Sequence, residues 1–92
     1  MNSCEAKISL NAAQRCLQRL CKHWSHKFQV RFDDREGAID FGTSRCELQV
    51  IDGGLLVRLS VDDPQELTEL QAAVAEHLDR MAGEPLQVDW RN

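Results

Sequence analysis

The chain has 92 residues, of which 42% are hydrophobic and 28% are charged, and its 15 acidic and 11 basic residues give a net charge of -4. This length fits a single domain over residues 1–92, and the composition is that of a folded globular protein rather than a disordered one. The negative charge and the scattered basic residues argue against nucleic-acid binding, which depends on neutralising phosphates. No apolar stretch is long enough to span a membrane, and Glu5 and Lys7 interrupt any secretory leader, so we expect no membrane contact and a cytoplasmic location.

The first two predicted elements are a strand and an amphipathic helix. Residues 4–10 alternate apolar and polar side chains, which is the pattern of a strand with one buried face. Asn11 and Gln14 have the spacing of a capping box and predict a helix start. Apolar residues then recur at helical spacing as far as Trp24, so the helix is expected to cover a sheet with one side.

The middle of the chain predicts four antiparallel strands joined by short turns. Residues 28–32 and 39–41 flank an acidic loop that includes Gly37, for which a positive φ is expected, and together they predict a hairpin. Residues 46–50 and 55–61 alternate again on either side of an Asp-Gly-Gly turn. These segments predict an antiparallel meander.

The last third of the chain predicts a second helix and a final strand. Asp63 followed by Pro64 is a strong helix start, because aspartate caps helix N-termini and proline suits the first helical position. Apolar residues continue at helical spacing over 67–81, and Gly83 is expected to end the helix. Alternation over 86–90 predicts a last short strand.

Because both helices have one apolar stripe and every strand has one apolar face, the sequence predicts an α+β two-layer sandwich. An antiparallel sheet would carry both helices on one face, in the order β-α-β-β-β-β-α-β. The other face would be open to solvent, as antiparallel sheets allow. We expect it to carry a mixed, mainly polar set of side chains: Lys7, Gln29, Arg31, Asp40, Glu47, Gln49, Leu56, Arg58 and Asp89.

Five segments spread over nearly the whole chain carry a family resemblance: LCKHWSHK at 20–27, the acidic pair at 33–34, GAIDFG at 37–42, RCEL at 45–48 and HL at 77–78. With this spacing they resemble an uncharacterised bacterial family, the domain-of-unknown-function family twenty-two-eighteen. The resemblance implies a sheet-plus-two-helices fold like that of TATA-binding-protein-like domains and the last domain of phosphohexomutases, with no established activity. Some relatives are encoded near siderophore-interacting flavoproteins, which implies an association with iron utilisation and a siderophore-related protein partner.

Three histidines and one cysteine have side chains that bind zinc, copper or iron. His23 and His26 are three residues apart and share a face if the first helix reaches that far. Cys46 and His77 are expected to point into the layer between sheet and helices. One hypothesis is therefore a metal site of these four residues. The alternative is that the histidines are solvated, capping or hydrogen-bonded and that Cys46 is a packing residue.

A further alternative is a small thiol-dependent enzyme, with Cys46 as the nucleophile and His77 or His26 as the base. Nothing in the sequence indicates an activated thiolate. The four cysteines include no CxxC pair, so in a reducing cytoplasm we expect buried apolar side chains rather than disulfides. The sequence favours a non-catalytic binding or accessory module over an enzyme.

Two surfaces are candidates for binding. The first is the corner around the histidines of the first helix, where Lys27 and Arg45 are expected to form a small anion site. The second is the open sheet face, through which we expect homodimerisation or the binding of a partner. Trp24 and Trp90 are either anchors at the margin of this face or part of the core.

Overall fold

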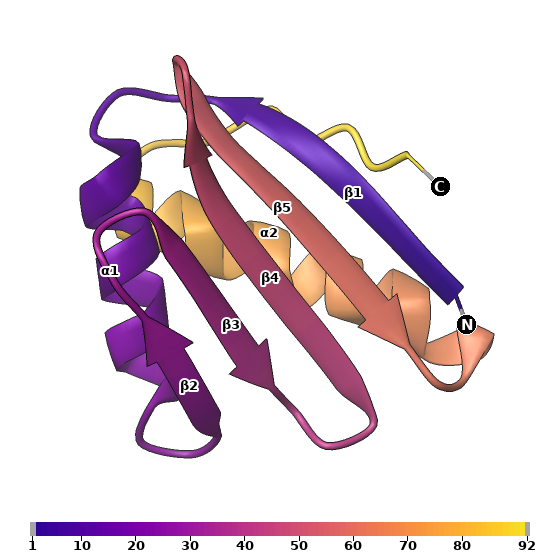
Figure 1. Ribbon diagram of the computed structural model, residues 1–92. Coiled ribbons are helices and arrows are strands. Elements are labelled where there is room, and N and C mark those ends of the chain that lie inside the picture. Colours follow the sequence, from indigo (N-terminus) through magenta and orange to yellow (C-terminus); the bar gives the residue numbers. More distant parts are fainter. Residues whose placement is uncertain (1, 92) are drawn as a thin grey trace.

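The computed structural model describes residues 2–91 and forms one five-stranded antiparallel sheet with two helices on the same face (Figure 1). The strands are β1 (Asn2–Ser9), β2 (Gln29–Phe32), β3 (Glu36–Asp40), β4 (Ser44–Ile51) and β5 (Gly54–Val61). The helices are α1 (Ala13–Trp24) and α2 (Leu67–Ala82), and a short 3-10 turn over Pro64–Glu66 precedes α2. The strand order across the sheet is β1-β5-β4-β3-β2. The predicted α+β architecture and the element order as far as the second helix are confirmed.

The core lies between the helices and one face of the sheet. Cys4 on β1 is opposite Leu59 on β5, which in turn is opposite Cys46 on β4, and all three are buried. Cys46 is also opposite Ile39 on β3, which is fully buried. Because side chains alternate along each strand, this register places the apolar residues of four neighbouring strands on one side and leaves the polar residues on the other.

The two helices cover different parts of the sheet. Helix α1 contacts β2, β3, β4 and β5, and it buries its whole apolar stripe: Ala13, Cys16, Leu17, Leu20, Cys21 and Trp24. Helix α2 contacts β5 and α1 and buries only Val74 and Leu78. The more strongly amphipathic helix is therefore the main cover of the core. Among residues 2–91, no helix has the length and apolar character needed to cross a membrane.

The start of α1 differs from the sequence prediction. Its N-cap is Ala12, which has a positive φ of 58° and no side-chain capping hydrogen bond, so the predicted capping box at Asn11 is wrong. The backbone N–H of Leu10 donates to the carbonyl of Gly53 at 3.1 Å, which keeps Leu10 beside the sheet. The chain must therefore turn into the helix within two residues, and Ala12 makes this turn in the left-handed conformation. For a residue other than glycine, this conformation costs about 1 kcal/mol or more.

Gly37 also has a different role from the one predicted. It lies within β3 opposite Phe32 and is not among the glycines with positive φ. The hairpin turn is instead stabilised by the Asp33 carboxylate, which accepts the backbone N–H groups of Arg35 and Glu36, both at 2.8 Å. A Cβ atom at position 37 would lie 2.7 Å from Cys21 Sγ, so glycine is needed here for the close approach of α1.

The predicted last strand is not formed. Residues 86–90 are outside the sheet, and within residues 2–91 the C-terminal segment pairs with β1 through a single bridge, between Arg91 and Glu5 (Figure 1). The two backbone hydrogen bonds of this bridge are 2.7 and 2.8 Å long. Leu86, Val88 and Trp90 are half-buried against the core, so their alternation reflects one-sided packing without strand pairing. Asp89 is therefore not part of the open face.

Candidate functional site

His23 and His77 come together where the end of α1 meets α2. Their ring centroids are 5.3 Å apart, and the planes of the rings are inclined by 50°. His23 is exposed and His77 is half-buried. The Trp24 ring packs against His77 at 4.7 Å and meets the edge of Phe41 at 5.1 Å, so an aromatic wall closes one side of the pair. We call His23 and His77 the histidine pair.

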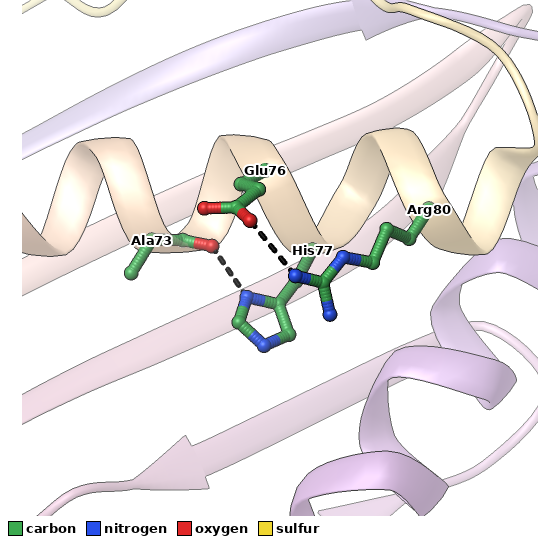
Figure 2. A network of polar contacts seen from close by, with 4 residues as sticks. All are labelled: Ala73, Glu76, His77 and Arg80. Carbon is green, nitrogen blue, oxygen red and sulfur yellow. Dashed lines mark hydrogen bonds and ion pairs between the residues drawn. The ribbon is translucent and has the colours of Figure 1, made fainter.

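A backbone hydrogen bond orients the ring of His77. Its Nδ1 atom lies 2.7 Å from the carbonyl oxygen of Ala73, one helical turn earlier (Figure 2). A carbonyl oxygen can only accept, so Nδ1 carries the hydrogen, and in the neutral imidazole Nε2 keeps its lone pair. On the same helix, Glu76 forms an exposed ion pair with Arg80 at 2.8 Å (Figure 2). The imidazole is thus held in the tautomer that presents Nε2 as a ligand or proton acceptor.

The four predicted metal ligands do not gather into one group. Within residues 2–91, no three or more His, Cys, Asp or Glu side chains are arranged to hold a metal ion. Helix α1 ends at Trp24, so His26 lies in the following turn, where helical spacing no longer places it on the face of His23. Cys46 is fully buried on β4 within the core. Only the histidine pair remains of the predicted set.

Burial disfavours the thiolate form of three of the four cysteines. All four cysteines are free and buried. Burial raises the pKa of Cys16 and of Cys21 to about 11, and burial also strongly raises the pKa of the Cys46 thiol. These three side chains therefore stay protonated at neutral pH. Cys46 is therefore not the activated thiolate that the thiol-dependent hypothesis from the sequence requires.

The open sheet face, defined here as the outward residues of β1 to β5, carries a balanced set of charges. Its four basic side chains are Lys7, Arg31, Arg45 and Arg58, and its four acidic side chains are Glu5, Glu36, Asp40 and Glu47. Four positive and four negative groups give this face a formal charge of zero, whereas the whole chain has -4. Glu5, Glu36 and Arg45 were missed as members of this face, although Glu5 alternates with the buried residues of β1 and Arg45 precedes the buried Cys46 of β4. Glu36 was assigned to the hairpin loop, and only the register shows that it begins β3.

One row of this face alternates in charge across the strands. The register places Glu5, Arg58, Glu47, Ala38 and Arg31 side by side on β1, β5, β4, β3 and β2. The carboxylate of Glu5 lies 3.7 Å from the guanidinium of Arg58, and both side chains are about half exposed. A depression of about 420 Å³ is lined by the members of this row on β2 to β5, and Glu5 lies outside it. The face is therefore a shallow surface on which charges of both signs are fixed at known positions.

Arg45, one residue of the predicted anion site, lies on the open sheet face opposite Asp40. Arg45 lines a second depression of about 690 Å³ together with Asp40 and Glu47, and Lys27 is not among the lining residues. Lys27 is exposed in the turn that follows α1. The two carboxylates beside Arg45 counteract its attraction for an anion. Trp24 is 7% exposed and belongs to the core, so it does not act as an anchor at the sheet margin.

Comparison with known proteins identifies relatives over nearly the whole chain. The sequence model of a family described as "Uncharacterized protein conserved in bacteria (DUF2218)" matches residues 5–91. The NMR structure of PA4090 from Pseudomonas aeruginosa is 40% identical in sequence and superposes with a TM-score of 0.83, over 99% of this chain and 96% of that chain. No curated protein matches the chain.

Proposed function

We propose that this chain, which belongs to the DUF2218 family of uncharacterised bacterial proteins, is a non-catalytic cytoplasmic binding module that associates with a second copy of itself through the open sheet face. The observation that supports this is the zero net charge of the face in an acidic chain. A nucleic acid or another strongly charged partner would favour a face of one sign. A face with equal numbers of both signs is suited to a partner that carries the same pattern.

The charges of the open face are complementary to themselves under one two-fold rotation. If the axis runs parallel to the strands between β4 and β5, β5 of one copy lies over β4 of the other, and β1 lies over β3. Arg58 then faces the partner's Glu47, and Lys7 faces the partner's Glu36, because each of these pairs occupies the same row of the register. The symmetry forms each ion pair twice. Two sheets packed face to face with nearly aligned strands are a common arrangement.

The size of the face indicates a weak, reversible dimer. Strands β1, β4 and β5 are about 26 Å long, β3 is about 17 Å long, and the strands are about 4.8 Å apart, so together they present roughly 460 Å² per copy. A stable interface of standard size buries about 800 Å² per partner. The association should therefore be concentration-dependent and should weaken as salt screens the ion pairs.

The alternative occupant of this face is a heterologous protein. The family resemblance implies a siderophore-related protein as such a partner, and the same charged rows would then meet a different complementary pattern. A test that depends on the self-complementary pairs separates the two occupants.

The pair of Lys7 and Glu36 provides this test, because three strand spacings separate the two residues within one chain. In a dimer of Lys7→Glu, or in a dimer of Glu36→Lys, the pair between position 7 of one copy and position 36 of the other becomes repulsive. The two-fold symmetry forms this repulsive pair twice. We expect each variant to be monomeric by sedimentation velocity at concentrations where the wild type dimerises. An equimolar mixture of the two variants should form heterodimers, because both cross-copy pairs are attractive again.

The matched control is Arg15→Glu, which makes a charge reversal on the exposed side of α1 and should leave association unchanged. A wild-type chain that is monomeric at about 1 mM would refute self-association, since even weak specific dimers are populated at that concentration. A mixture of the two variants that fails to associate would refute the proposed two-fold arrangement.

A further inference from the structure

We infer that the histidine pair is a binding site for one divalent transition-metal ion, with two imidazole ligands from this chain and the remaining positions open. The site is independent of the proposed dimer, because it lies between the helices on the opposite side of the sheet. Imidazole nitrogen favours copper, nickel and zinc, and the general affinity order places Cu²⁺ first.

The separation of the two rings fits coordination of one ion. A metal lies about 2.0–2.1 Å from an imidazole nitrogen, and therefore about 3.2 Å from the centre of the ring. Two such rings at the tetrahedral angle have centroids about 5.2 Å apart. The rings of His23 and His77 are separated by 5.3 Å. The distance between the ring centroids therefore matches that expected for two imidazoles bound to one ion.

The surroundings of His77 are those of an oriented ligand. In metal sites, the second nitrogen of a ligating histidine usually donates to a carbonyl or a carboxylate, which fixes the ring and its tautomer. The Ala73 carbonyl has this role here, at 2.7 Å from Nδ1. Nε2 is consequently the expected metal-binding atom of His77. Glu76 on the neighbouring position is paired with Arg80.

The walls of the site differ in polarity. The Trp24 ring shields His77 on one side, at 4.7 Å between centroids, whereas His23 is exposed to solvent. An ion held by two ligands at such a surface keeps water on its other positions. These open positions can accept an oxygen or nitrogen ligand from a small molecule, as open metal sites do.

The test uses untagged protein, treated with a chelator and then dialysed, at concentrations where sedimentation shows a monomer. Calorimetric titration with Cu²⁺, Ni²⁺ or Zn²⁺ alone should give one ion per chain. His23→Gln and His77→Gln should each weaken binding by about tenfold or more, because each removes one of two protein ligands. His26→Gln is the matched control, since it removes an exposed histidine of the same corner, and its affinity should stay within about twofold of wild type.

A second measurement, by NMR, identifies which nitrogen of His77 binds the metal. With Zn²⁺, the ¹⁵N resonance of His77 Nε2 should shift strongly and that of Nδ1 should remain typical of a protonated nitrogen. Because His23 is exposed, His23→Gln is expected to fold normally. Its metal affinity therefore tests the proposed site even if His77→Gln is unstable. The proposed site would be overturned by any of three results: no binding at about 1 mM metal, unchanged metal affinity in His23→Gln, or a loss of metal affinity in His26→Gln as large as that in His23→Gln.

Discussion

Replacing Gly37 with alanine is expected to destabilise the fold through one contact, between the sheet and α1. The new Cβ atom would lie 2.7 Å from Cys21 Sγ, while its other close neighbours, Phe32 Cβ at 3.4 Å and Leu17 Cδ2 at 3.5 Å, are at ordinary contact distance. Cys21 is fully buried, so its sulfur has no open space to move into. Relief of the contact therefore requires a shift of α1, which also positions His23.

The expected magnitude follows from two opposing effects. Forcing one extra methyl group into a packed core costs about 1–3 kcal/mol. Replacing glycine by alanine in a strand returns about 0.5–1 kcal/mol, because the unfolded chain loses conformational freedom. We therefore expect the free energy of unfolding of Gly37→Ala to fall by about 1–2 kcal/mol.

A double-mutant cycle with Cys21→Ala isolates the contact. The second substitution removes Sγ, so Gly37→Ala in that background should be neutral or slightly stabilising, with a coupling energy of about 2 kcal/mol between the two positions. Urea unfolding monitored by circular dichroism and tryptophan fluorescence gives the four free energies. A coupling energy within about 0.5 kcal/mol of zero would show that the sheet and α1 do not approach as closely as described.

Two further predictions concern pH. Burial raises the pKa of Cys16 and Cys21 from 9.0 to about 11, so the unfolded chain loses these protons first. The free energy of unfolding should be unaffected by these thiols below about pH 9 and should fall by about 2–3 kcal/mol per thiol as the pH approaches 11. The fall should be smaller in Cys16→Ala than in the wild type. Urea unfolding that gives the same alkaline decrease for both proteins would contradict this. The backbone N–H groups of Arg35 and Glu36 lower the pKa of Asp33, so its stabilising effect should persist above the ordinary carboxyl range and be lost only as the pH falls through the lowered value. The amide resonances of Arg35 and Glu36 should report a midpoint below 3.8, and a midpoint at or above that value would disagree with the hydrogen bonds.

The comparison between sequence and structure is clearest at the histidines. Helical spacing identified His77 as part of the apolar side of α2, and the sequence grouped it with His23, His26 and Cys46 as candidate metal ligands, of which Cys46 was expected to face the same layer. The crossing of α1 and α2 instead brings His77 against His23 and Trp24, which are more than 50 positions away along the chain. A local pattern contains no information on where two helices cross. The presence of Trp24 beside His23 was the one available signal, since a buried aromatic residue marks the helix side near a contact.

The sequence by itself determined the fold class, the order of elements through the second helix and the apolar side of each element. These properties depend on periodicity, which neighbouring residues express within a few positions. Tertiary structure alone decided that residues 86–90 pack without strand pairing, that Gly37 makes room for α1, and that Lys7 and Glu36 share a row. Each of these depends on the register or on the distance between distant segments, and both are set by packing the whole core at once.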